Sequence, residues 1–157
     1  MADYAFLTAW RVAAGRDVVF EAIHASEQWP QWWDGVESVV KLEEGDPEGR
    51  GSVGRYVWRS ALRYRLEFDM RITRVDRPHR MDGQAMGELT GTGSWRLYED
   101  DGATAVLFEW RVQTTRRWMN ALAPVGRPVF RWNHDRLMRA GARGLARRLG
   151  VELLSGG

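Results

Sequence analysis

A long stretch with a hydrophobic period of two, from Val36 to Thr115, most strongly limits how this chain can fold. Strands are predicted at about 36–44, 54–60, 63–76, 79–89, 92–99 and 104–115. In the third of these, apolar side chains from Leu66 to Ile72 alternate with polar ones, so one face is buried. Connections of a few residues are too short for parallel crossovers, which predicts an antiparallel sheet.

The segments before this stretch predict one strand and two short helices. Residues 3–13 are rich in aromatic and β-branched side chains and form the first strand. Asp17 is expected to cap a helix that runs to about Ala25. A second short helix is expected to begin at Trp29, because Pro30 fits the first turn of a helix.

The hydrophobic period changes to about 3.6 after Pro124, which predicts a final helix that runs to about Leu149. The order of elements is then a strand, two short helices, six strands and one long helix. The length is that of one domain, so residues 1–157 are expected to form a single α+β unit.

The widths of these elements predict a cavity. Seven strands about 4.8 Å apart make a sheet roughly 30 Å wide, whereas one helix is only about 10–12 Å across. The sheet must therefore curl around the last helix, and apolar surface is left between them. The chain has nine tryptophans, whose large rings need such a place. We expect the aromatic side chains to line a ligand cavity.

Three segments, together with this order of elements, resemble a known superfamily. They are His24–Trp33 after the first helix, Gly91–Trp95 at the start of a strand, and Phe130–Met138 followed by Gly141 and Gly144 in the last helix. The chain resembles the SRPBCC, or START-like, superfamily and its polyketide cyclase/dehydrase branch. The resemblance implies a helix-grip fold, a curved seven-stranded antiparallel sheet around a long C-terminal helix, with a ligand cavity between them. Because this fold serves lipid carriers, hormone receptors and aromatase/cyclases, it implies no particular reaction.

Ten apolar side chains are expected to line the cavity. They are Trp33, Trp58, Phe68, Met70, Met86, Trp95, Phe108, Trp110, Phe130 and Leu137. The register of strand 54–60 leaves two alternatives, with either Trp58 or Arg59 pointing inward. We favour Trp58, because an inward Arg59 would be a buried charge without a partner.

Two polar side chains, Tyr64 and Asn133, are expected to orient the ligand by hydrogen bonds. Asn133 has an alternative role, a structural hydrogen bond to the sheet or to a tryptophan N–H, because a buried amide needs a partner.

No metal site or cofactor is expected, because the three histidines lie on different elements and the chain has no cysteine. His24 is expected to satisfy carbonyls at the end of its helix, with a position facing the cavity as the alternative. An aromatase/cyclase would need a proton carrier in the cavity. The candidates for that role are Tyr64, His24 and His134.

The sequence supports three hypotheses about function. The leading one is a protein that binds a small hydrophobic ligand, which would be aromatic, polyketide-like or a lipid. The second is an aromatase/cyclase. The third uses the last helix, where seven arginines and one aspartate lie between Arg127 and Arg148, to bind RNA or anionic lipid headgroups. A solvated outer face explains the same arginines, so nucleic acid is not the expected partner.

Location and assembly are also predicted. No apolar run is long enough to cross a bilayer and no leader peptide precedes the first strand, so we expect a cytoplasmic protein without integral membrane segments. Trp32 and Trp33 are adjacent on one short helical turn and are not expected to point inward together. One of them could then mark a surface for self-association, which makes a homodimer an alternative.

Overall fold

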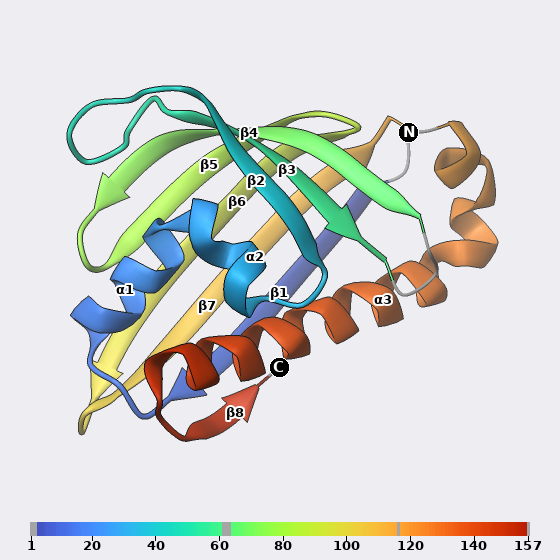
Figure 1. Cartoon of the computed structure of the whole chain (residues 1–157). Coiled ribbons are helices and arrows are strands. Elements are labelled where there is room, and N and C mark those ends of the chain that lie inside the picture. The colour runs from blue at the N-terminus through green and yellow to red at the C-terminus, as the bar shows by residue number, and fades with distance from the viewer. Residues whose placement is uncertain (1–2, 61–63, 116, 157) are drawn as a thin grey trace.

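The chain folds as an antiparallel sheet wrapped around one long helix (Figure 1). The computed structural model describes residues 3–60, 64–115 and 117–156, without the side chains of 118–120 and 122–125. In chain order the elements are β1 (Asp3–Val12), α1 (Arg16–His24), the 3-10 helix η1 (Ser26–Gln28), α2 (Trp29–Trp32), β2 (Val36–Glu43), β3 (Val53–Arg59), β4 (Arg65–Asp76), β5 (Arg80–Gly87), β6 (Leu89–Asp100), β7 (Ala103–Thr114), α3 (Arg117–Leu149) and β8 (Leu153–Gly156).

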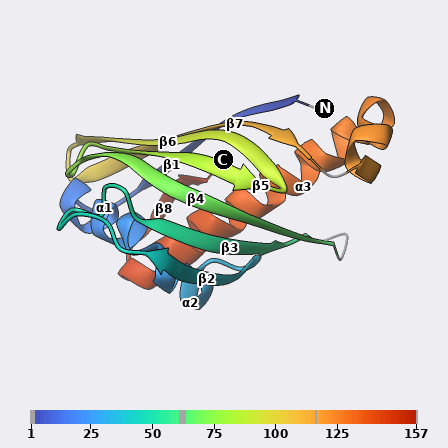
Figure 2. The same ribbon diagram turned by 90° about the horizontal axis from the view of Figure 1, so that it is seen from above.

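The predicted α+β helix-grip fold is confirmed, with eight strands instead of seven. The strand order is β2-β3-β4-β5-β6-β7-β1-β8, and every neighbouring pair is antiparallel. The additional strand, β8, pairs with residues Trp10 to Val12 of β1 after the chain leaves α3. Seen from above, α3 lies between β2 and β3 on one side and β6, β7 and β1 on the other (Figure 2).

The two short helices follow β1 as expected and cover one end of the trough (Figure 1). The prediction that Asp17 caps α1 is wrong, because the cap is Gly15 and Asp17 lies in the first turn. There its negative charge interacts favourably with the positive end of the helix dipole. The apolar face of α1, formed by Val19, Phe20 and Ile23, is buried.

The long helix begins earlier than predicted. It starts at Arg117 and passes through Pro124 and Pro128, with a visible change of direction in its first part (Figure 1). A proline removes one helical hydrogen bond and favours a kink, but flanking turns can continue the helix. The end at Leu149 is as predicted.

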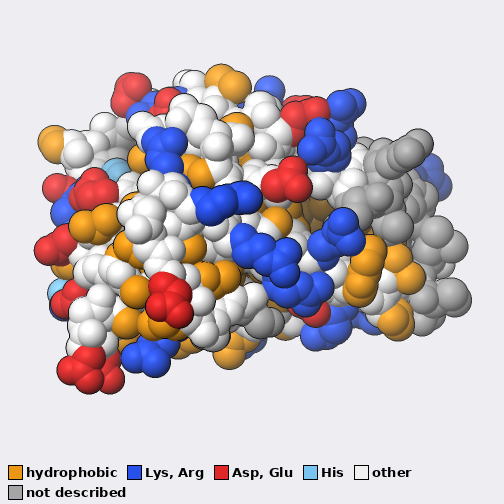
Figure 3. All heavy atoms as spheres, turned by 60° about the horizontal axis from the view of Figure 1, so that its bottom comes forward, with side chains coloured by type: hydrophobic (Ala, Val, Ile, Leu, Met, Phe, Trp, Pro, Cys, Tyr) orange, Lys and Arg blue, Asp and Glu red, His pale blue; other side chains and the backbone are white. Residues whose placement is uncertain are grey.

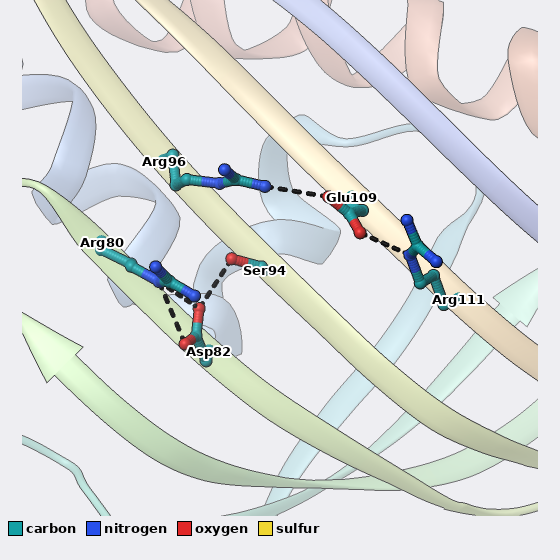
Figure 4. A network of polar contacts seen from close by, with 6 residues as sticks. All are labelled: Arg80, Asp82, Ser94, Arg96, Glu109 and Arg111. Atoms are coloured by element: carbon teal, nitrogen blue, oxygen red, sulfur yellow. Dashed lines mark hydrogen bonds and ion pairs between the residues drawn. The ribbon is translucent and has the colours of Figure 1, made fainter.

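The outer face of the sheet is held together by polar contacts across β5, β6 and β7. Figure 4 shows six of these residues: Arg80, Asp82, Ser94, Arg96, Glu109 and Arg111. Asp82 accepts hydrogen bonds from Ser94 Oγ at 2.7 Å and from Arg80 Nε at 3.0 Å. Partial burial alone would raise the pKa of the Asp82 carboxyl, but these hydrogen bonds outweigh it and lower the pKa. This face is therefore a polar layer, and the apolar chemistry lies on the other side of the sheet.

Candidate ligand-binding site

The concave side of the sheet holds a dense aromatic cluster. Seven of the described tryptophans are buried there: Trp10, Trp29, Trp32, Trp33, Trp58, Trp95 and Trp110. Their rings contact each other and nearby phenylalanines, with centroids 4.1 Å apart for Trp95 and Phe108 and 4.9 Å apart for Trp29 and Trp33. These rings occupy most of the space between the sheet and α3.

The described residues enclose two apolar hollows inside the trough, among other pockets. The inner hollow has a volume of about 30 Å³. Of the side chains expected from the sequence to line the cavity, those that line this hollow are Trp58, Phe68, Met70, Trp95, Phe108 and Trp110. The mouth hollow has a volume of about 70 Å³, and the predicted residues that line it are Trp58, Tyr64, Trp110, Phe130, Asn133, His134 and Leu137.

Both hollows are much smaller than the roughly 300–1,000 Å³ of a typical small-molecule pocket. The large cavity that the helix and sheet widths predict is therefore not open in this structure. The physical reason is the volume of the indole rings, which fill the trough that they were expected to line.

Trp58 and Trp110 separate the two hollows, because both side chains line both of them. Their ring centroids are 6.1 Å apart. Trp58 points inward, as favoured from the sequence, while Arg59 is exposed with its guanidinium 3.6 Å from the Asp34 carboxylate. A movement of either tryptophan would join the hollows into one space.

Met86 was predicted to line the cavity, but it lies on the outer face of the sheet. It pairs with Asp69, whose side chain forms an ion pair on that outer face with Arg55. Met81 and Ala85 point inward instead, and Met81 lines the inner hollow. In β5, apolar residues occur at both odd and even positions. Alternation alone therefore did not show which face of this strand is buried.

Trp33 lines neither hollow. It is 1% exposed, and its Nε1–H donates to the carbonyl oxygen of Leu137 at 2.9 Å. Trp32 is buried as well, so the expectation that only one of this pair points inward is wrong. Both indoles approach α3, Trp33 at Gly141 and Trp32 at Gly144, and Trp33 also contacts the rings of Trp10 and Trp95 on the sheet.

His24, the last residue of α1, lines neither hollow but lies at a neighbouring pocket that shares Tyr56 and Met70 with the inner hollow. Its Nε2–H donates to the carbonyl oxygen of Glu48 at 2.7 Å, and its ring stacks on Phe20. The imidazole therefore satisfies a carbonyl in the β2–β3 connection and not, as expected, one at the end of its own helix.

Asn133 and Tyr64 lie at the mouth hollow. Asn133 Oδ1 accepts a hydrogen bond from Ser60 Oγ at 3.0 Å, which is the structural alternative considered from the sequence. The Tyr64 ring meets Phe130 edge to face, with centroids 6.2 Å apart. The turn predicted near residues 61–62 lies outside the described part of the chain.

His134 is the most unusual polar group of the mouth hollow. It is 7% exposed and stacks on Phe6, with centroids 3.9 Å apart and an interplanar angle of 11°. Among the described residues, neither ring nitrogen has a partner within hydrogen-bond distance, and the nearest carboxylate oxygen, Asp135 Oδ1, is 3.7 Å from Nδ1. Burial, helped by the charge of Arg131, lowers the pKa of His134 to about 4 although Asp135 opposes this. The neutral ring thus keeps one donor and one acceptor without a hydrogen bond, beside the hollow that it helps to line.

A family of known proteins matches this chain from residue 8 to residue 150. Its description is polyketide cyclase / dehydrase and lipid transport. The chain belongs to this family. The expected membership of the SRPBCC, or START-like, superfamily is confirmed.

Solved structures with the same fold include aromatase/cyclases and a START superfamily protein. The Zhui aromatase/cyclase from Streptomyces sp. R1128 is 18% identical, with a TM-score of 0.77 over 95% of this chain and 94% of that chain. A START superfamily protein from Mycobacterium smegmatis is 14% identical, with a TM-score of 0.75 over 93% and 97% of the two chains.

The di-domain ARO/CYC BexL from the BE-7585A biosynthetic pathway is 18% identical, with a TM-score of 0.73 over 92% of this chain. This chain spans about half of that protein, 49% of its length. No curated protein matches the sequence. At these identities the likeness to solved structures shows the fold alone.

Two further observations on this polyketide cyclase/dehydrase family member concern metal groups and membrane-spanning helices. Among the described residues, no three histidine or carboxylate side chains gather as a group that could hold a metal ion. None of the helices in the described part of the chain is long and apolar enough to cross a membrane. The side chains that line the mouth hollow supply apolar contact and a few hydrogen-bonding groups.

The buried His134 predicts a loss of stability at mildly acidic pH. The unfolded chain takes up a proton near pH 6.5, whereas the folded ring stays neutral down to about pH 4. Between these values the unfolded state binds more protons, so stability falls as the pH falls. We expect the free energy of unfolding to decrease by as much as about 3 kcal/mol over this window.

Urea denaturation of wild type and His134→Phe at pH 7 and pH 4.5 measures this effect. The variant keeps an aromatic ring against Phe6 but has no titrating group, so its stability should change less between the two pH values. His79→Gln, a change at an exposed histidine, is the matched control. An equal pH dependence in wild type and His134→Phe would contradict the prediction.

Proposed function

We propose that this protein binds a small hydrophobic ligand in the mouth hollow, between the sheet and α3. The observation that carries this proposal is His134, a buried neutral imidazole that lines an apolar hollow and has no hydrogen-bond partner among the described residues. Leaving a buried polar group unsatisfied costs about 1–3 kcal/mol. A ligand that supplies a hydroxyl or carbonyl group to His134 recovers this free energy.

The size of the hollow limits what can be enclosed. An apolar cavity of about 150 Å³ holds one benzene molecule, and the mouth hollow is about half as large. It accepts one aromatic ring or a short alkyl end after small movements of its walls. A longer aromatic, polyketide-like or lipid molecule must extend out of the hollow or displace Trp58 or Trp110 toward the inner hollow.

An aromatase/cyclase activity is the second candidate. It is favoured by the fact that Tyr64 and His134, two of the three predicted proton carriers, line the same hollow, whereas His24 does not. Proton transfer is most effective when the pKa of the catalyst is near the working pH. The low pKa of His134 makes it a weak base at neutral pH, so binding is the better supported function.

Comparing two small probes tests the binding proposal. We expect p-cresol, at millimolar concentration, to raise the melting temperature of the wild type more than toluene does, because only p-cresol hydrogen-bonds to His134. Calorimetric titration of the same probes gives their affinities. In His134→Phe the preference for p-cresol should disappear, and in His79→Gln it should remain. Absence of binding by both probes would overturn the proposal.

A further inference from the structure

Two arginines of α3 lie against the aromatic walls of the mouth hollow. The guanidinium carbon of Arg127 is 5.1 Å from the ring centroid of Tyr4, and that of Arg131 is 5.3 Å from the ring centroid of Phe6. Tyr4 and Phe6 both line the hollow. Two positive charges therefore lie next to the rings that an apolar ligand would contact.

Neither arginine is neutralised by a carboxylate within the described part of the chain. Arg127 donates a hydrogen bond to the carbonyl oxygen of Asp3, and Arg131 lies over the Phe6 ring and interacts electrostatically with His134. Arginines on the sheet behave differently, since Arg55 and Arg65 each pair with a carboxylate within 3 Å. The two charges of α3 thus remain available to an anion.

The field of these arginines reaches the groups around the hollow. Burial is the main cause of the low pKa of His134, and the charge of Arg131 lowers that pKa further. Burial raises the pKa of Tyr4, and Arg127 opposes that increase. At Tyr4 the effect of Arg127 has the sign of a positive potential, which favours a negative group on a ligand, whereas at His134 the Asp135 carboxylate has a larger effect than Arg131 and the opposite sign.

A surface groove adjoins the same place. Its volume is about 590 Å³, and Arg111, Arg127 and Arg131 are among its walls, against one carboxylate, that of Asp3. It shares Tyr4 and Val112 with the mouth hollow. Since the hollow encloses at most one ring, the rest of a ligand must lie outside it, and this groove offers the space.

We infer that the ligand is an amphipathic carboxylate, whose apolar end enters the mouth hollow while Arg127 and Arg131 bind its carboxylate group. This inference rests on the proposed function and adds the chemical class of the ligand. Guanidinium groups bind carboxylates through paired, charge-assisted hydrogen bonds, which makes arginine well suited to this task.

Other arginines of the same helix provide matched controls. Figure 3 shows arginine side chains gathered over the face that α3 forms. Arg143 and Arg147 are exposed on this helix, and neither contacts the aromatic rings of the hollow. If the basic surface acted only through its total charge, removal of either pair of arginines would have the same effect.

Calorimetric titration with 4-ethylbenzoate and with its methyl ester tests the inference. We expect the acid to bind wild type at least tenfold more tightly than the ester, with a preference that decreases as salt is added. The double variant with Arg127→Gln and Arg131→Gln should lose about tenfold or more in affinity for the acid and keep its affinity for the ester. The double variant with Arg143→Gln and Arg147→Gln should bind both ligands as wild type does.

The outcomes separate this inference from the function on which it rests. Equal affinity for acid and ester, or equal losses in the two double variants, would overturn the carboxylate assignment and leave apolar binding intact. If p-cresol, the acid and the ester all failed to bind, the proposed function itself would be wrong. All four arginines are at exposed positions, so both double variants should fold. Circular dichroism and melting temperatures of the two double variants check this.

Discussion

Replacement of Gly144 by alanine is expected to prevent stable folding. A methyl group at this position of α3 would overlap the backbone carbonyl oxygen of Trp32 in α2. A side chain could rotate away from such an overlap, but a backbone carbonyl cannot, so α2 and α3 would have to separate. Separation would expose apolar surface of Trp32 and Trp33, which are both buried in this arrangement.

The expected cost of Gly144→Ala is at least about 4 kcal/mol, which is a large part of the total stability of a typical domain. Urea denaturation followed by circular dichroism measures it. Arg143→Ala changes the adjacent exposed residue of the same helix and should shift the midpoint only slightly. A Gly144→Ala protein with the midpoint of wild type would show that α2 and α3 do not approach as closely as described.

The sequence predicted the long elements of the fold and their order better than its short strand and the start of its last helix. The period of two and the later period of 3.6 predicted the sheet, the last helix and their order, because each pattern is long enough to identify its element. The strand β8 was missed because four residues, Leu153–Gly156, are too few to show alternation. The start of α3 was placed too late because Pro124 and Pro128 interrupt the helical pattern within the helix.

The candidate site was predicted less completely than the fold. Inward positions such as Phe68, Trp95 and Phe108 follow from alternation along strands with one buried face. The volume of the hollows does not follow from the sequence, because it depends on how the rings of several strands pack together. The buried environment of His134 could not be predicted either, because its ring is covered by Phe6, which is distant in the sequence.

Replacement of Trp58 by alanine is expected to join the inner and mouth hollows into one cavity. Removal of a buried tryptophan ring costs about 3–5 kcal/mol, partly because a cavity remains. The cost for Trp58→Ala should lie near the lower end, about 3 kcal/mol, because the buried Nε1–H of Trp58 has no hydrogen-bond partner among the described residues. Urea denaturation measures this loss, and Trp132→Ala, at an exposed tryptophan, serves as the control.

The cavity made by Trp58→Ala should accept the ring that was removed. Indole at millimolar concentration is expected to raise the melting temperature of the variant by several degrees and that of wild type by less, since ligand binding to the folded state stabilises it. If the walls instead collapsed into the space, indole would not distinguish the two proteins. Rescue of Trp58→Ala but not of Trp132→Ala would show that the Trp58 side chain fills the volume between the two hollows and limits the size of the ligand that this trough can hold.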